Sequence, residues 1–153
     1  VIEGDIAGQI DAEKMEKMGI PVVQLNTDGA CHIEAMSIQH ILPDFDLNSL
    51  DVIFVENIGN LVCPADFRIA ILSVPEGDDK VAKYPLMFAT TDALILNKYD
   101  MIPYFDFDTN RVMDDAVDVN PNVKIINVSS KTGEGLSELC EWFCSMVDNK
   151  TDR

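Results

Sequence analysis

The sequence predicts an α/β fold in which helices cover both faces of a mostly parallel β-sheet. Two observations lead to this prediction. Short apolar runs rich in β-branched residues, without polar alternation, indicate strands that are buried on both faces. Amphipathic segments separate these runs, and strands that alternate with helices form right-handed parallel βαβ units. The length of 153 residues is enough for one domain with a substantial core.

Five apolar runs are the predicted strands, and Val1 and Ile2 indicate the remainder of a sixth strand that is cut at its start. The five runs are residues 21–25, 52–55, 69–74, 93–96 and 123–128. The predicted helices are residues 11–18, 33–42, 110–119 and 135–147. Gly19 and Pro21 after the first helix, and Pro43 after the second, are typical stop signals.

Charge and cysteine usage narrow the class of protein. With 27 acidic and 11 basic residues, the formal net charge is −16. Nucleic acids and anionic membranes require a basic surface, so we expect neither as a partner. No apolar stretch approaches the roughly 18–20 residues that span a bilayer, and no signal-peptide core follows the first residues. The four cysteines are too sparse for a disulfide framework. We therefore expect a cytoplasmic protein.

The segment after the predicted strand at residues 93–96 has the chemistry of a guanine-binding loop. It contains Asn97, Lys98 and Asp100, and ligands of parallel sheets bind at the carboxyl ends of strands. The Asp100 carboxylate offers two acceptors to the guanine N1–H and exocyclic amine, a donor pair that adenine lacks. Asn97 is placed to reach the opposite edge of the base, and the aliphatic stem of Lys98 to lie along its face. The alternative is an ordinary polar turn.

A second loop, one βα unit later, supports the same interpretation. Ser129, Ser130 and Lys131 follow the last predicted strand, and Thr132 and Gly133 lead into the last helix. A backbone N–H in this turn would donate a hydrogen bond to guanine O6. Alone, such a turn is a common helix entry. Together, the two loops resemble the base-recognition pair of P-loop GTPases.

The phosphate-binding loop of those GTPases is not found in the sequence. No G-x-x-x-x-G-K-[ST] pattern occurs, since none of the eight glycines precedes a lysine. We expect a P-loop NTPase fold, truncated at its N-terminus, that lacks the first strand and the phosphate loop. On this interpretation residues 1–148 form the GTPase domain and residues 149–153 a C-terminal tail, and the chain alone binds GTP weakly or not at all.

Two other loops carry soft metal ligands. Cys31 and His32 follow the first complete predicted strand, and Cys63 follows the second. Thiolates and imidazoles suit zinc, nickel or copper and suit calcium or magnesium poorly. Three donors do not complete a tetrahedral site, whereas two subunits pool six donors across a two-fold axis. From the residues alone, a metal site and a set of purely structural side chains are equal alternatives.

Six segments, in the same order along the chain, resemble the hydrogenase nickel-incorporation GTPases, the HypB family. They are residues 1–6, 26–32, 56–65, 73–85, 97–100 and 129–133. The resemblance covers nearly the whole chain, and residues 56–64 are its most specific segment. The resemblance implies a short acidic connector where Phe67 meets Arg68. Either this member has a shortened loop or the sequence leaves out a stretch of the chain, and we expect the second.

The resemblance implies a GTP-binding and hydrolysing protein that assists nickel insertion into the hydrogenase precursor. It implies that Cys31, His32 and Cys63 bind Ni²⁺ or Zn²⁺ at the interface of a homodimer that GTP promotes. It also implies two partners, a small zinc-containing metallochaperone and the precursor of the hydrogenase large subunit.

The candidate catalytic residues are Glu56 and Gly59, which are spaced as GTPases space an acidic residue and a γ-phosphate-sensing glycine. Glu56 is the predicted Mg²⁺ ligand, with Asp5 and Asp11 as other candidates for magnesium or the first switch. These two aspartates have ordinary alternatives as a polar strand end and a helix N-cap. Gly59 and Cys63 share one loop, so a loop ordered by the γ-phosphate would also move a metal ligand.

Three other functions remain open. They are a urease accessory-type nickel GTPase, a dimer that stores metal without GTPase function, and a guanine-nucleotide switch whose cysteines and histidine are structural. Cys140 and Cys144 lie on an apolar stripe of the last helix and are predicted core residues, whereas Trp142 falls outside that stripe. His40 is predicted to be structural or at the surface. Residues 78–80 match a family loop without an assigned role.

Overall fold

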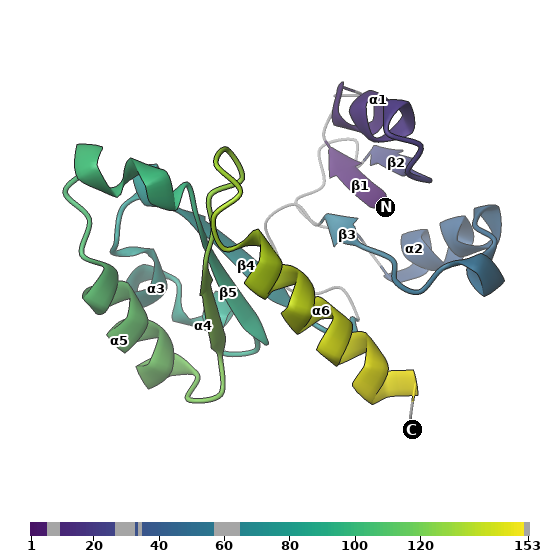
Figure 1. Cartoon of the computed structure of the whole chain (residues 1–153). Coiled ribbons are helices and arrows are strands. Elements are labelled where there is room, and N and C mark those ends of the chain that lie inside the picture. Colours follow the sequence, from purple (N-terminus) through teal and green to yellow (C-terminus); the bar gives the residue numbers. More distant parts are fainter. Residues whose placement is uncertain (6–9, 27–32, 34, 57–64, 152–153) are drawn as a thin grey trace. The chain divides into compact units, whose positions relative to one another are not determined.

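The computed structural model describes residues 1–5, 10–26, 33, 35–56 and 65–151. The chain divides into two compact units, Val1–Pro64 and Ala65–Arg153, and each is described by itself (Figure 1). Strands and helices alternate in both units, and every strand pair among the described residues is parallel. The predicted α/β class is therefore confirmed. Within the described residues, no helix has both the length and the hydropathy that crossing a bilayer requires.

The N-terminal unit is built on a three-stranded sheet with the order β2-β1-β3. Its strands are β1 (Ile2–Asp5), β2 (Val23–Asn26) and β3 (Val55–Glu56). Its helices are α1 (Ile10–Lys17), α2 (Ala35–Ile41) and the 3₁₀ turns η1 (Leu42–Asp44) and η2 (Leu47–Ser49). Ile2 is paired with Val23 on one side and Val55 on the other, so β1 is the central strand.

A glycine in this central strand permits close packing. Gly4 is buried, and a Cβ atom built on it would lie 2.6 Å from Ile33 Cδ1 and 3.0 Å from the Glu56 carbonyl oxygen. Ile33 is only 1% exposed. The space that a side chain at residue 4 would need is thus filled by Ile33, which packs on the centre of the sheet.

The C-terminal unit has a second three-stranded sheet, with the order β4-β5-β6. Its strands are β4 (Ile69–Ser73), β5 (Ala93–Asn97) and β6 (Lys124–Asn127). Its helical elements are η3 (Val74–Glu76), α3 (Lys80–Lys83), α4 (Pro85–Phe88), η4 (Tyr99–Tyr104), α5 (Thr109–Val119) and α6 (Leu136–Thr151). The register pairs Leu96 with Leu72 of β4 and with Asn127 of β6, so the strands end at one edge.

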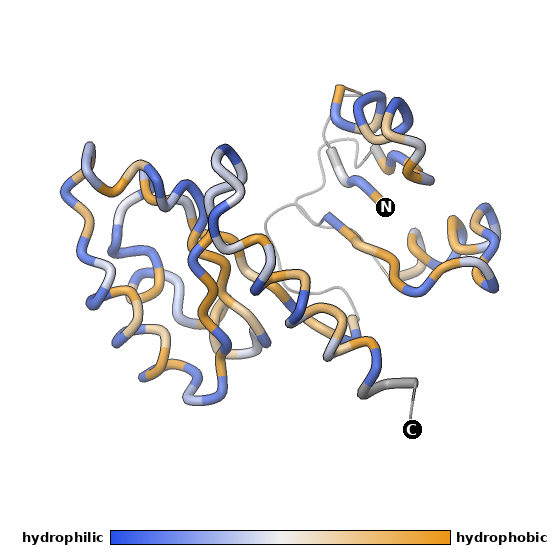
Figure 2. The backbone as a smooth tube through the Cα atoms, viewed as in Figure 1, coloured by the Kyte–Doolittle hydropathy of each residue, from blue (hydrophilic) through white to orange (hydrophobic). Residues whose placement is uncertain are grey.

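Helices cover both faces of this sheet, and β5 shows why. Its residues are almost all buried and alternate between two clusters, as side chains on a strand do. Leu94 and Leu96 pack with residues of α3, α4 and α5, including Val112. Ile95 packs on the opposite face in a cluster that includes Trp142 of α6. The hydropathy colouring shows the apolar residues gathered along these central strands (Figure 2).

The structure differs from the predicted elements mainly where segments are short. Of the strand predicted at residues 52–55, only Val55–Glu56 is a strand by backbone pairing, with the pair shifted one residue further along the chain. Helices α3 and α4 have four residues each, too few to show a helical hydrophobic period. Helix α6 continues to Thr151, beyond its predicted end at residue 147. The assignment of residues 1–148 to one nucleotide-binding domain stays a prediction.

The prediction that Cys140 and Cys144 fill the core is wrong, because both residues are exposed. The α6 residues that pack on the sheet are Leu139 and Trp142. Trp142, predicted outside the buried stripe, thus belongs to it. The helix has apolar residues around much of its circumference, so periodicity alone did not identify the face that meets the sheet.

Candidate functional site

The end of β5 places three of the predicted base-binding residues in a constrained turn. The strand ends at Asn97, and η4 begins at Tyr99. Lys98 between them has φ 55° and ψ 38°, and it is the one non-glycine residue with positive φ in the described part of the chain. Its backbone N–H donates to Asn97 Oδ1 at 2.7 Å. A left-handed lysine costs about 1 kcal/mol or more, so surrounding contacts must hold it.

The loop after β6 supplies part of that support. Its backbone is closed on itself by hydrogen bonds from Ser129 N to Glu134 O (2.9 Å) and from Gly133 N to Ser129 O (2.8 Å). The Ser129 hydroxyl also accepts a bond from Thr132 N at 3.1 Å. At the end of this loop Gly135 has φ 74°, and a Cβ atom there would lie 1.9 Å from the Asn127 carbonyl oxygen. Only glycine fits this close approach of backbones.

Side chains of the two loops are joined by direct hydrogen bonds. Ser129 Oγ donates to Asp100 Oδ1 at 2.6 Å. Ser130 donates to Asn97 Oδ1 from its hydroxyl at 3.1 Å and from its backbone at 3.4 Å. The backbone N–H of Tyr99 donates to Val128 O at 3.1 Å. The two predicted base-binding loops, residues 97–100 and 129–131, therefore form one hydrogen-bonded structure.

The joined loops surround a hollow of about 230 Å³. It is lined by Asn97, Lys98, Asp100, Met101, Ser130 and Lys131. Five of these were predicted as nucleotide-binding residues, and the sixth predicted residue, Ser129, does not line the hollow but donates a hydrogen bond to the Asp100 carboxylate. Met101 was missed, because an apolar residue after the loop carries no polar signal. Two lysine stems and a thioether offer apolar surface to a planar ring, and Asp100 offers an acceptor.

The remaining predicted residues are not brought together in the described part of the structure. Cys31, His32, Gly59 and Cys63 lie outside the described residues. Glu56 is exposed at the end of β3. Asp5 ends β1. Among the residues that are described, no group of three or more His, Cys, Asp or Glu side chains is arranged to hold a metal ion. The metal site stays a prediction.

Asp11 has a local partner. It lies in the first turn of α1, after the first helical residue rather than at the N-cap position, and it accepts a bond from Lys14 Nζ at 2.6 Å. This hydrogen bond and the charge of Asp11 raise the pKa of Lys14. An acidic residue in the first turn is also favoured by the helix dipole. His40, predicted to be structural or at the surface, is exposed, and its Nδ1 lies 2.8 Å from Met36 O.

The loop at residues 78–80, without a predicted role, anchors α5. Asp78 accepts hydrogen bonds from the Asp108 backbone N–H at 2.9 Å and from Arg111 Nη1 at 3.1 Å. Asp108 is in turn the N-cap of α5, bonded to the backbone of Asn110 and Arg111. Asp78 therefore connects the segment after β4 with the start of a helix thirty residues later.

Comparisons with known proteins also indicate a nucleotide-binding domain. The family profile described as "CobW/HypB/UreG, nucleotide-binding domain" matches residues 1–127. Hydrogenase maturation factor HypB from Azotobacter vinelandii is 44% identical over 149 residues, which are 94% of this chain and 49% of that protein. A probable hydrogenase maturation factor HypB from Methanocaldococcus jannaschii is 40% identical, covering 93% of this chain and 67% of the relative. The chain thus spans about half the length of the first of these relatives.

Solved structures give the same relationship. The crystal structure of HypB from Helicobacter pylori in complex with nickel matches with a TM-score of 0.90 and 36% identity, over 97% of this chain and 74% of that one. The hydrogenase maturation factor HypB from Archaeoglobus fulgidus matches with a TM-score of 0.83 and 31% identity, over 95% and 75% of the two chains. Because sequence and fold agree over nearly its whole length, the chain belongs to the HypB family of the CobW/HypB/UreG nucleotide-binding domains.

Proposed function

We propose that this chain is the base-binding part of a GTPase that assists nickel insertion into a hydrogenase precursor. The observation that carries the proposal is the hydrogen-bonded pair of loops around the 230 Å³ hollow. Family membership supports it, since the relatives above are named hydrogenase maturation factors.

Guanine recognition follows from the donors and acceptors that the hollow presents. The Asp100 carboxylate accepts the two guanine donors, N1–H and the exocyclic amine. Ser129, 0% exposed, donates to Asp100 Oδ1 and so fixes the plane of the carboxylate. Asn97 Oδ1 accepts bonds from Lys98 and Ser130, which leaves the Asn97 amide nitrogen to face the base. Adenine carries an acceptor where guanine has its N1–H, so it would be rejected.

Hydrolysis requires groups that bind the phosphates. Mg²⁺, when bound, would neutralise charge on the β- and γ-phosphates. Glu56 is the residue proposed to hold it or its water shell, and its place at the end of β3 and its exposure are compatible with that role. Asp5, at the end of the neighbouring strand β1, and Asp11 are the other candidates. Gly59 is proposed to sense the γ-phosphate.

Nickel is the proposed cargo, with Zn²⁺ as the alternative metal. The proposed ligands are Cys31, His32 and Cys63, a donor set that suits both ions. The nickel complex of the Helicobacter pylori relative supports nickel as the metal. We infer that two copies of the chain share the metal in a homodimer in the cytoplasm. The proposed partners are the hydrogenase large-subunit precursor and a small zinc-containing metallochaperone.

A second candidate recipient is urease. A relative from Helicobacter hepaticus, 40% identical over 153 residues, is named a hydrogenase/urease maturation factor. Activation of purified apo-hydrogenase and apo-urease by the nickel-loaded protein distinguishes the two recipients.

Exchange of one acceptor for a donor tests the base assignment. In Asp100→Asn the side chain donates where guanine has a donor, and xanthine offers a carbonyl oxygen there instead. For the whole protein, of which this chain is the proposed base-binding part, we expect GDP affinity to fall by about 100-fold, which is about 2.7 kcal/mol, and XDP affinity to rise. Displacement of a fluorescent nucleotide by GDP, XDP and ADP measures both. An unchanged ratio of GDP to XDP affinity would remove Asp100 from the site.

A further inference from the structure

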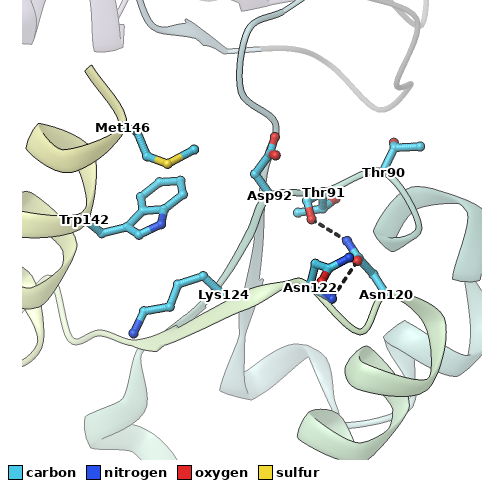
Figure 3. A pocket seen from close by; sticks show the side chains of 8 residues that line it. All are labelled: Thr90, Thr91, Asp92, Asn120, Asn122, Lys124, Trp142 and Met146. Atoms are coloured by element: carbon cyan, nitrogen blue, oxygen red, sulfur yellow. Dashed lines mark hydrogen bonds between the residues drawn. The ribbon is translucent and has the colours of Figure 1, made fainter. Parts of the chain in front are cut away.

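A second hollow, of about 410 Å³, lies at the opposite end of the β4-β5-β6 sheet from the base-binding loops. Asp92 directly precedes β5, and Lys124 begins β6, whereas the base-binding loops follow the other ends of these strands. Trp142 and Met146 of α6 form one side, and the turns before β5 and β6 form the other (Figure 3). The full lining is Thr90, Thr91, Asp92, Asn120, Asn122, Lys124, Trp142 and Met146.

Hydrogen bonds hold the polar side of this hollow in place. Asn120 donates its side-chain amide to Thr91 O at 2.8 Å and accepts at Oδ1 from Asn122 N at 3.1 Å. Asp92 Oδ2 accepts from Arg68 N at 2.7 Å. The backbone N–H of Lys124 donates to Asp92 O at 3.0 Å. These walls are formed before any ligand arrives, so binding would cost little reorganisation.

The charges of the hollow favour a cation. The Lys124 ammonium is paired with Glu138 Oε1 at 2.6 Å, so its charge is compensated within the chain. Asp92 is exposed and its carboxylate lines the hollow. The chain as a whole carries −16, which raises the local concentration of cationic partners and repels anionic ones.

An aromatic ring stands across the hollow from the polar turns. Trp142 is partly buried, packs against the cluster that contains Ile95, and also lines the hollow. Figure 3 shows the indole and the Met146 thioether together on the α6 side, with Asp92 between them and the two threonines. A flat cation can stack on an indole and bond to a carboxylate at the same time, which a compact ammonium ion does less well.

We propose that this hollow binds the guanidinium group of an arginine side chain that a partner protein presents. Trp142 stacks on the guanidinium plane and Asp92 accepts its N–H groups, while Met146 contacts the aliphatic stem. Because the hollow and the base-binding loops lie at opposite ends of the strands, both can be occupied together. The inference does not depend on the identity of the nucleotide.

The single tryptophan makes the proposal directly measurable. The probe is the peptide acetyl-Gly-Arg-Gly-amide, and its match is the same peptide with citrulline, which has the same shape without the charge. We expect a saturable change in Trp142 emission with the arginine peptide, and at least about tenfold weaker binding of the citrulline peptide. Calorimetry in parallel detects binding that leaves the emission unchanged.

Two charge-matched variants separate a local contact from the general field of the protein. Asp92→Asn should weaken binding of the arginine peptide at least about fivefold. Asp114→Asn changes the net charge equally on an exposed residue of α5 and should leave the affinity within about twofold. Trp142→Phe, followed by calorimetry, should also weaken binding. No saturable binding by either method, equal binding of both peptides, or equal effects of the two aspartate variants overturns the proposal.

Discussion

At the scale of single residues, the hydroxyl of Ser129 is the group through which the proposed guanine recognition by Asp100 can be tested without changing Asp100 itself. It donates to Asp100 Oδ1 at 2.6 Å and accepts from Thr132 N at 3.1 Å. Ser129→Ala removes both bonds in a fully buried position. We expect the GDP affinity of the whole protein to fall about fivefold, corresponding to about 1 kcal/mol, and the free energy of unfolding to fall by about 1–3 kcal/mol.

Ser137→Ala is the matched control for this prediction, since Ser137 is exposed on α6. Nucleotide displacement and urea unfolding on both variants separate the two effects. If Ser129→Ala lowers the unfolding free energy but leaves GDP affinity unchanged, Ser129 supports the loop and does not position Asp100.

The contact between Gly4 and Ile33 predicts a steric rescue. Gly4→Ala places a methyl group 2.6 Å from Ile33 Cδ1, and such overpacking costs about 1–3 kcal/mol. Ile33→Val removes that terminal carbon but leaves the Glu56 carbonyl oxygen 3.0 Å away, so the double variant should recover part of the lost stability, measured by urea unfolding. Additive destabilisation in the double variant would contradict the close packing. Since Ile33 directly follows His32, nickel affinity of the same variants shows whether this anchor also matters for the proposed metal ligand.

A site residue could be predicted from the sequence where its role follows from its residue type, and could not where its role depends on the strand register or the backbone conformation. The loops at residues 97–100 and 129–131 were predicted to meet, because carboxyl ends of parallel strands share one edge. The pairing of Ser129 with Asp100 was not predicted, since it requires the β5–β6 register that pairs Leu96 with Asn127. The contact of Met101 with the hollow and the left-handed backbone conformation of Lys98 could not be predicted, because neither residue type indicates them.

At the scale of elements, the connection between the β4 loop and α5 gives a testable stability contribution. Asp78, with a side chain 20% exposed, bonds to the Asp108 backbone and to Arg111. Asp78→Ala should lower the free energy of unfolding by about 1–2 kcal/mol. Asp79→Ala is the control, because the Asp79 side chain is half-exposed and its ion pair with Lys80 is long, at 3.7 Å. This variant should change the free energy of unfolding by at most about 0.5 kcal/mol. If thermal or urea unfolding shows equal losses of stability in Asp78→Ala and Asp79→Ala, the hydrogen bonds of Asp78 do not stabilise the start of α5.

The elements themselves were predictable where they are long or continuously apolar. Strand β5 and helix α5 begin and end within about one residue of prediction. Helices α3 and α4 were missed because four residues depend on neighbouring turns for their stability. The buried face of α6 was misassigned because Cys140 and Leu139 are equally apolar by pattern, and only the position of the sheet distinguishes them.

At the scale of the whole molecule, strong negative charge is consistent with handling of a divalent cation. A charge of −16 raises the local concentration of Ni²⁺ without selecting it. Selection must come from soft ligands, because carboxylates bind many divalent ions. The proposed set is Cys31, His32 and Cys63, and one subunit leaves it undersaturated. Metal binding should therefore be coupled to association of two copies.

Replacement of one proposed ligand tests this coupling of metal binding and assembly. Cys63→Ala should weaken nickel affinity by at least about tenfold and abolish metal-dependent dimerisation. GDP affinity should stay within about twofold, since the base-binding loops belong to another unit of the chain. Cys140→Ala is the control, and as an exposed residue it should change stability by at most about 0.5 kcal/mol.

Nickel titration against a chelating indicator measures the nickel affinity, and light scattering on the same samples measures the metal-dependent dimerisation. The ligands must lose protons to bind, so affinity should fall as the pH drops below about 6.5. The Ni²⁺–thiolate charge-transfer band should weaken in Cys63→Ala and persist in Cys140→Ala. Equal nickel affinity in the wild type and Cys63→Ala would exclude Cys63 as a ligand, and loss of the band only in Cys140→Ala would place the metal on α6 instead. Nickel binding without dimerisation would mean that a single subunit completes the coordination with groups other than these three.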